Sequence, residues 1–158
     1  DKTACLFRAS AELGAVLAKS QQPNAAHHQT MMQRFGLLLG QCFQIADDVL
    51  DYRADDDMLG KNIGDDLAEG KITLPLILAL KQGNTSQQEI LRSTIEHTDL
   101  SNLGQVCDIL IELKALDQSM RRAEELADQA HACLAPLPDS PHKDALAVVL
   151  EHAVHRNR

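Results

Sequence analysis

The chain has 158 residues, a formal net charge of −8 and few aromatic residues, with no Trp and one Tyr. This length is enough for one domain with a real core, and the composition favours packed helices over a β-sandwich. The acidic balance argues against a nucleic-acid partner and against docking on an anionic membrane by charge alone. No apolar run approaches membrane-spanning length and no signal peptide is visible, so we expect no integral membrane segment.

Apolar residues recur at helical spacing along the chain, and no strand pattern interrupts them. The sequence therefore predicts an all-α protein with a single helical domain over residues 1–158. The predicted helices span about 3–19, 25–53, 74–81, 86–97, 100–114, 117–134 and 142–155. Asp65 or Asp66 is expected to cap a short turn, and Pro75 to lie in the first turn of its helix.

The cysteines are far apart and lack Cys-x-x-Cys spacing, and each has apolar helical neighbours. These features predict buried free thiols in a reducing environment, and hence a cytoplasmic protein. The four residues are Cys5, Cys42, Cys107 and Cys133.

The apolar run 35–50 ends in a group of oxygen-bearing side chains. On a helix that turns by about 100° per residue, Asp47 and Asp51 lie about 40° apart. Gln44 lies at about 60° from Asp47 and Asp48 at about 100°, so all four project from one flank. Carboxylates this close need a counter-charge, and Mg²⁺ accepts carboxylates together with waters and phosphate oxygens. The spacing indicates a magnesium site.

Two lysines follow in the acidic segment after this helix. Lys61 and Lys71 are each preceded by glycine, and lysine is a point charge suited to phosphate oxygens. Together these residues predict a charge-balanced stack of aspartates, metal, diphosphate and lysines. The alternative is a solvated acidic turn between two helices, which the preceding Gln44 and the two Gly-Lys pairs disfavour.

Two other patterns in the sequence bear on metal binding. His152 and His155 share a helix face, but no third ligand has suitable spacing for zinc, so we expect surface or half-buried histidines. The segment 55–66 partly imitates a calcium loop, but Leu59 stands where a ligand is needed and the final bidentate glutamate is missing.

The residues 43–51, followed by Gly60-Lys61 and by 66–75, resemble the second aspartate-rich region of trans-polyprenyl diphosphate synthases. Lys2-Thr3 matches the Lys-Thr pair of that family, and the tail over 137–158 is similar to bacterial octaprenyl diphosphate synthases. The resemblance covers essentially the whole chain.

This resemblance implies the isoprenoid synthase helical fold and a prenyltransferase that condenses isopentenyl diphosphate with an allylic diphosphate. Three Mg²⁺ ions between two facing aspartate motifs would ionise the allylic diphosphate. The product would be a long-chain trans-polyprenyl diphosphate, octaprenyl for quinone side chains, and the enzyme a homodimer.

The resemblance also assigns roles to individual residues. Asp47 is the strongest metal ligand, with Asp48 and Asp51 as direct or water-mediated supporters, and the three count as catalytic together with Lys61. The expected substrate-binding residues are the cations and polar groups Lys2, Thr3, Gln44, Lys61 and Lys71.

The sequence departs from the family in lacking the first aspartate-rich motif and the Arg-Arg pair that follows it. The chain also begins with Asp1-Lys2-Thr3 inside a helical pattern. We therefore expect the C-terminal half of a longer synthase, inactive alone, with an apolar patch exposed around Leu37, Leu38 and Phe43. The open alternatives are a non-catalytic partner subunit of a heteromeric synthase and a class I terpene cyclase.

Overall fold

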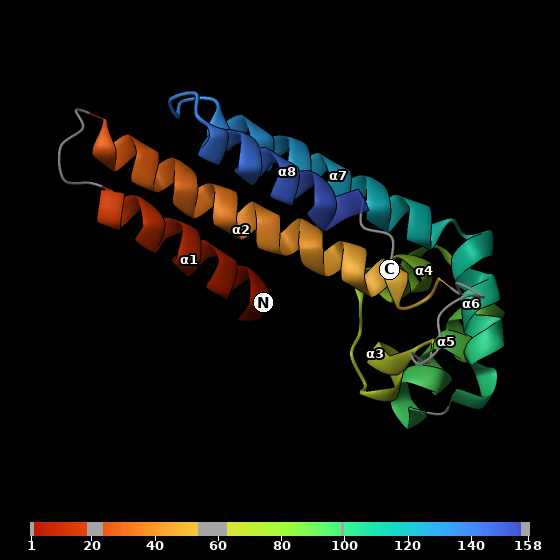
Figure 1. The fold of residues 1–158 in the computed structure, drawn as a ribbon. Helices are drawn as coiled ribbons and strands as arrows, with labels where there is room; N and C mark the ends of the chain where they lie inside the picture. Colours follow the sequence, from red (N-terminus) through yellow and green to blue (C-terminus); the bar gives the residue numbers. More distant parts are fainter. Residues whose placement is uncertain (1, 19–23, 54–62, 99, 156–158) are drawn as a thin grey trace. The chain divides into compact units, whose positions relative to one another are not determined.

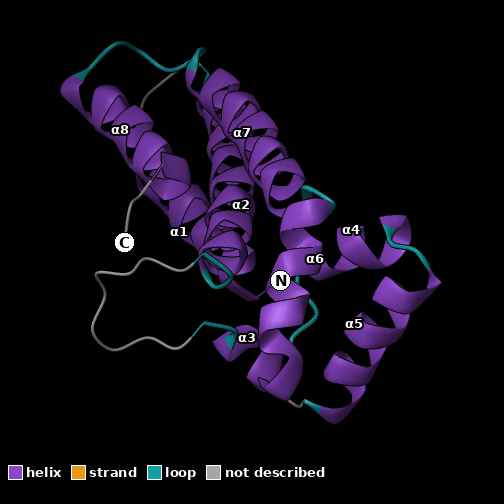
Figure 2. Cartoon of the chain, turned by 90° about the vertical axis from the view of Figure 1, so that its right-hand side faces the viewer, coloured by secondary structure: helices purple, strands orange, loops and turns teal. Residues whose placement is uncertain are grey.

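The computed structural model describes residues 2–18, 24–53, 63–98 and 100–155. Helices make up its regular structure, and no strand occurs in these ranges (Figure 2), so the all-α prediction is confirmed. The elements are α1 (Lys2–Ala18), α2 (Ala25–Leu50), α3 (Asp65–Ala68), α4 (Leu74–Gln82), α5 (Thr85–His97), the 3₁₀ turn η1 (Leu100–Asn102), α6 (Leu103–Glu112), α7 (Ala115–Leu134) and α8 (Pro141–His155).

The chain divides into two compact units. The first contains Asp1–Ala46 and Arg122–Arg158, and the second contains Asp47–Arg121. Helices α2 and α7 each begin in one unit and end in the other. The prediction of one domain over the whole chain stays a prediction.

The first unit is built from long helices, with α1 beside α2 and α8 beside α7 (Figure 1). Its core takes one apolar stripe from each helix, as amphipathic helices require. The buried side chains include Ala4, Phe35, Leu38, Leu39, Cys42, Ala46, Ala123, Leu126, Ala130, Cys133, Leu134, Leu150, Ala153 and Val154.

Glycine allows α1 to lie very close to α2. A Cβ atom at Gly36 would meet the Phe7 carbonyl oxygen at 2.5 Å and the Arg8 Cα at 2.9 Å, and one at Gly40 would meet the Ala4 Cα at 2.6 Å. Real Cβ atoms essentially never make contacts under 3.0 Å. The two glycines, one turn apart on α2, therefore form the surface on which the backbone of α1 rests.

Side chains fix the register of α1 on α2. The Glu12 carboxylate accepts hydrogen bonds from the amides of Gln29 at 3.2 Å and Gln33 at 3.0 Å. Near the other end of α1, the rings of Phe7 and Phe43 lie 5.6 Å apart between centroids, within the range of favourable aromatic contacts.

The second unit has its own core, in which α4, α5 and α6 pack together (Figure 2). Its fully buried side chains are Val49, Leu67, Leu76, Ala79, Leu91, Val106, Leu110 and Ala115. Pro75 lies in the first turn of α4, as predicted. Asn84 and Gln87 form a capping box at the start of α5, a motif that satisfies two helix N–H groups reciprocally.

Three local predictions are corrected. Helix α2 ends at Leu50 rather than near 53, because its last turn tightens into i→i−3 bonds from Tyr52 to Val49 and from Arg53 to Leu50. The helix expected over 100–114 is instead the turn η1 followed by α6.

The short turn is capped by Gly64, and neither Asp65 nor Asp66 is its cap. Gly64 has a φ of 82°, a left-handed conformation that costs glycine little. A Cβ there would also meet a methyl carbon of Leu103 at 2.7 Å. The left-handed backbone conformation therefore selects glycine at this position.

Burial also departs from expectation at some apolar positions. Cys5 is exposed and Cys107 half-buried, whereas Cys42 and Cys133 are buried as predicted, and all four thiols are free. Leu38 is buried, contrary to the expected exposure.

The exposed large apolar side chains of the first unit lie instead on α1 and α8: Leu6, Leu13, Val16, Leu17, Val148 and Val149. Within the described ranges, none of the helices combines the length and apolar composition needed to cross a membrane.

Candidate functional site

The end of α2 and the segment that follows α3 carry a network of opposite charges in the second unit. The Lys71 ammonium donates to the Asp48 carboxylate at 2.8 Å and to the Asp66 carboxylate at 2.9 Å. The Asp48 side chain is only 9% exposed and that of Lys71 is 39% exposed. Burial alone would lower the pKa of Lys71, but its hydrogen bonds to the two carboxylates raise it above its ordinary value. Lys71 is therefore the internal counter-ion of this acidic cluster.

The third member of the aspartate motif is held by backbone groups. The Asp51 carboxylate accepts a hydrogen bond from the Asp66 N–H at 3.1 Å, and its main-chain carbonyl accepts from the Gly64 N–H at 3.0 Å. Asp51 is buried, with 5% of its surface exposed. The turn at 64–66 thus folds back onto the end of α2 and supplies donors to a carboxylate that would otherwise be costly to bury.

Asp47 differs from its two neighbours in the motif. It is half-buried, whereas Asp48 and Asp51 are buried. In the described part of the chain, no three or more His, Cys, Asp or Glu side chains are grouped so that they could hold a metal ion. The geometry therefore leaves Asp47 as the most accessible carboxylate of the motif, with two internally compensated carboxylates behind it.

The candidate residues Lys2, Thr3 and Gln44 belong to the first unit. Lys2 and Thr3 open α1, and the contact between Ala4 and Gly40 places that end of α1 beside the turn of α2 that leads to Gln44. Lys2 is exposed, and Thr3 and Gln44 are half-buried. These three candidates gather at one end of the α1–α2 pair.

Two further residues need separate comment. Lys61 lies outside the described residues. Asp66, expected only as a possible helix cap, is part of the network through both its carboxylate and its N–H. The signal for Asp66 was its position five residues before Lys71 in the same motif.

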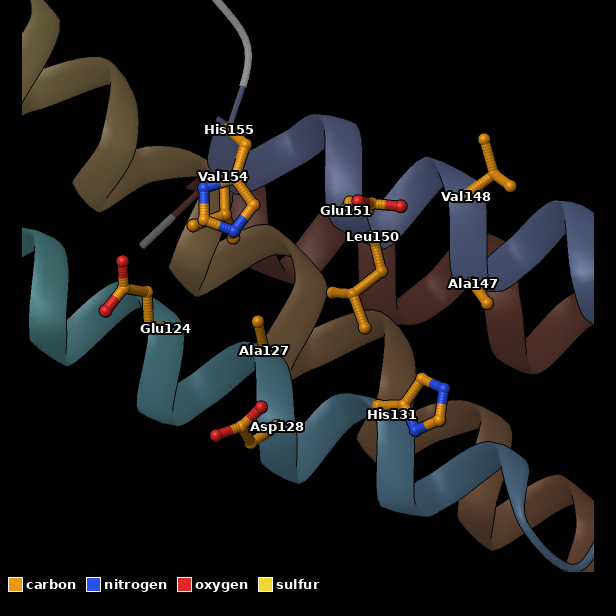
Figure 3. Close-up of a pocket in the computed structure, with 10 residues that line it drawn as sticks. All are labelled: Glu124, Ala127, Asp128, His131, Ala147, Val148, Leu150, Glu151, Val154 and His155. Atoms are coloured by element: carbon orange, nitrogen blue, oxygen red, sulfur yellow. The ribbon is translucent and has the colours of Figure 1, made fainter.

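Two pockets lie along the helices of the first unit. One groove of about 390 Å³ runs between α7 and α8, where Ala127 and Leu150 point into the gap and Glu124, Asp128, His131 and His155 stand around it (Figure 3). Another, of about 490 Å³, is lined by the end of α1, the start of α2 and the start of α8. Neither is lined by a residue of the aspartate and lysine motif.

The fold and this motif define the class of protein. The model of the polyprenyl synthetase family matches residues 1–113, and the chain belongs to that family. It is 41% identical to octaprenyl diphosphate synthase of Haemophilus influenzae over 157 residues, covering 99% of this chain and 46% of that enzyme. It is also 41% identical to octaprenyl diphosphate synthase of Escherichia coli over 158 residues, covering 99% of this chain and 48% of that enzyme.

Solved structures agree with this assignment. A polyprenyl synthase from Caulobacter crescentus, complexed with calcium and isoprenyl diphosphate, matches with a TM-score of 0.87 and 36% identity. The match covers 99% of this chain and 47% of that one. The chain therefore spans about half the length of the relatives it matches, and its helices follow the polyprenyl synthase fold.

Proposed function

We propose that this chain is the C-terminal half of a trans-polyprenyl diphosphate synthase, a prenyltransferase that joins isopentenyl diphosphate to an allylic diphosphate. The observation that carries the proposal is the network at the end of α2, in which Lys71 pairs with two carboxylates, in a chain of the polyprenyl synthetase family. The names of the two octaprenyl synthase relatives support a long-chain product, octaprenyl. The family match favours this reading over a class I terpene cyclase.

The donors present fit Mg²⁺ as the metal. This ion keeps several waters and takes one or two carboxylates together with substrate phosphate oxygens, so one accessible carboxylate from this half is sufficient. Asp47 would be that ligand, and Asp48 and Asp51 would hold the helix end and the lysine segment in place behind it. When bound, the ion would supply positive charge against the diphosphate leaving group.

The lysines have two different roles in this proposal. Lys71 is engaged by Asp48 and Asp66 and therefore organises the carboxylates more than it contacts a ligand. Lys2 and Lys61 are the cations proposed for the diphosphate itself, while Thr3 and Gln44 would orient the allylic substrate. Positioned charges of this kind act by stabilising developing negative charge on the leaving group.

Alone, the chain should lack prenyl transfer, because the first aspartate-rich motif is not in its sequence. The exposed apolar side chains on α1, among them Leu13 at 60% and Leu17 at 83% exposure, support a face that is covered in the working enzyme. Exposed apolar patches drive association, so we propose that the isolated chain self-associates and that the whole enzyme is a homodimer.

A chimera tests the proposal. The matched half of the E. coli octaprenyl diphosphate synthase is replaced by this chain, and the product is incubated with Mg²⁺, farnesyl diphosphate and labelled isopentenyl diphosphate. We expect elongated prenyl products from the chimera and none from the chain alone. The matched control is the same chimera carrying Asp47→Asn, which keeps the size of the side chain and removes its charge.

The outcomes separate the candidates. A folded chimera that makes no product, beside an active E. coli enzyme, would favour the non-catalytic partner subunit. Elongation by the chain alone would refute the argument that it holds only half of the site.

A further inference from the structure

Two buried hydroxyl groups lie beside the charged network and have no role in it so far. Tyr52 directly follows Asp51 and is 3% exposed, and Thr73 lies two residues after Lys71 and is 2% exposed. Among the described residues, neither the Tyr52 phenol oxygen nor the Thr73 hydroxyl oxygen has a hydrogen-bond partner of standard geometry. Buried hydroxyls without partners are rare and costly, so each calls for an explanation.

The two hydroxyl groups lie near each other. Burial raises the pKa of the Tyr52 phenol above its ordinary range, and the Thr73 hydroxyl acts in the opposite direction. Asp51 and Asp66 raise the same pKa further. The phenol is therefore near both Thr73 and the carboxylates of the network.

Thr73 also does not cap its helix through its side chain. It is the N-cap residue of α4, yet its side chain makes no capping hydrogen bond. Threonine at this position usually caps, and losing a cap costs about 1 kcal/mol. Its hydroxyl is instead buried on the side of Tyr52. The missing helix cap and the missing hydrogen-bond partners of the two hydroxyls both lower the stability of the folded chain.

We propose that Tyr52 and Thr73 are positioning residues of the candidate diphosphate site, a hydroxyl pair that holds the Lys71 segment against the end of α2. The inference rests on the proposed function. Residues 71–73 have no helical structure of their own. Two ties connect this segment to residues 48–52: the ion pair of Lys71 with Asp48, near the end of α2, and the contact of Thr73 with Tyr52, just after it. The hydroxyl pair would thus keep Lys71 in register between its two carboxylates.

The test measures binding of inorganic diphosphate with Mg²⁺ to the 158-residue chain by calorimetry. The variants are Tyr52→Phe and Thr73→Val, which remove only the hydroxyls, their double variant, and Thr73→Ser as the matched control. Outer-shell partners of metal sites typically contribute about tenfold or more to affinity, so we expect each single variant to bind about tenfold more weakly. The double variant should be no weaker than either single one, and Thr73→Ser should bind as wild type does.

Stability provides the second readout. Replacing both partners by apolar groups of the same shape is close to neutral for stability, so the double variant should unfold at the same or a higher urea concentration than wild type. In a Lys71→Met background, Thr73→Val should have no further effect on diphosphate affinity, because the pair acts through the lysine.

Each outcome has one meaning. Variants that bind diphosphate as tightly as the wild-type chain would overturn the inference and leave the proposed function standing. Variants that lose binding and stability together would assign the pair a purely structural role, which also overturns it. A wild-type chain without any diphosphate binding would overturn both the inference and the proposed diphosphate site.

Discussion

Replacing Gly36 by alanine should separate α1 from α2. The new Cβ would meet two backbone atoms of α1, the Phe7 oxygen at 2.5 Å and the Arg8 Cα at 2.9 Å, together with the Ala11 Cβ at 2.8 Å. Backbone atoms cannot move aside by a rotamer change, so α1 must shift by roughly 1 Å to restore ordinary contacts. Overpacking of this kind costs about 1–3 kcal/mol, which exceeds the gain of about 1 kcal/mol from replacing a helical glycine.

Gly14 provides the matched control for this substitution. It lies in α1, and a Cβ added there meets nothing within 4 Å. Gly14→Ala should therefore stabilise the chain by about 0.5–1 kcal/mol through helix propensity alone. Urea unfolding followed by circular dichroism should rank the proteins Gly14→Ala above wild type and wild type above Gly36→Ala. A Gly36→Ala chain as stable as Gly14→Ala would refute the close packing of the two helices.

Two further predictions concern single side chains. In the chimera, Asp47→Ala should lower turnover by about a hundredfold or more with little loss of stability, because electrostatic groups at a developing charge contribute that much; near wild-type turnover at saturating Mg²⁺ would remove Asp47 from the metal site. Burial raises the pKa of the Cys42 thiol from 9.0 to about 11, so the unfolded chain releases this proton first and stability falls as pH rises from 9 to 11. Between pH 8 and pH 11 the free energy of unfolding of wild type should fall by roughly 2–3 kcal/mol more than that of Cys42→Ala. Equal decreases in the two proteins would contradict this prediction.

The helices were predictable because their signals are local. Apolar spacing, Pro75 and the Gly-Asn break before α5 act within a few residues, and the observed elements follow them closely. The partners of Asp48 were not predictable in this way. Helical spacing placed it on one flank with Asp47, but only the fold of residues 63–71 brings Lys71 back over it.

The same limit applies to the hydroxyl pair and to α1. No local rule predicts that the Thr73 side chain makes no capping hydrogen bond. The residue near its hydroxyl is Tyr52, which is 21 residues earlier in the sequence. The close packing of α1 depends on Gly36 and Gly40, whose lack of a side chain admits its backbone to one face of α2. Spacing along one helix shows which side chains share a face, and other segments decide what covers it.

The internal charge balance has a consequence for metal dependence. Lys71 and the N–H of Asp66 compensate the carboxylates of Asp48 and Asp51 within the protein, so the fold needs no metal to tolerate its acidic cluster. Removal of divalent ions by EDTA should therefore leave the unfolding temperature of the chain nearly unchanged. Mg²⁺ at a concentration equal to its dissociation constant would add only about 0.4 kcal/mol.

The Lys71→Met chain should behave differently, because Asp48 and Asp66 then lack their cation and Mg²⁺ can replace it. Its unfolding temperature, lower than that of wild type in EDTA, should rise with added Mg²⁺. The measurement is thermal unfolding of both chains over a Mg²⁺ titration at constant ionic strength, which separates site binding from general screening. A wild-type chain that unfolds in EDTA, or a Lys71→Met chain that ignores Mg²⁺, would show that the carboxylates are not balanced by this lysine.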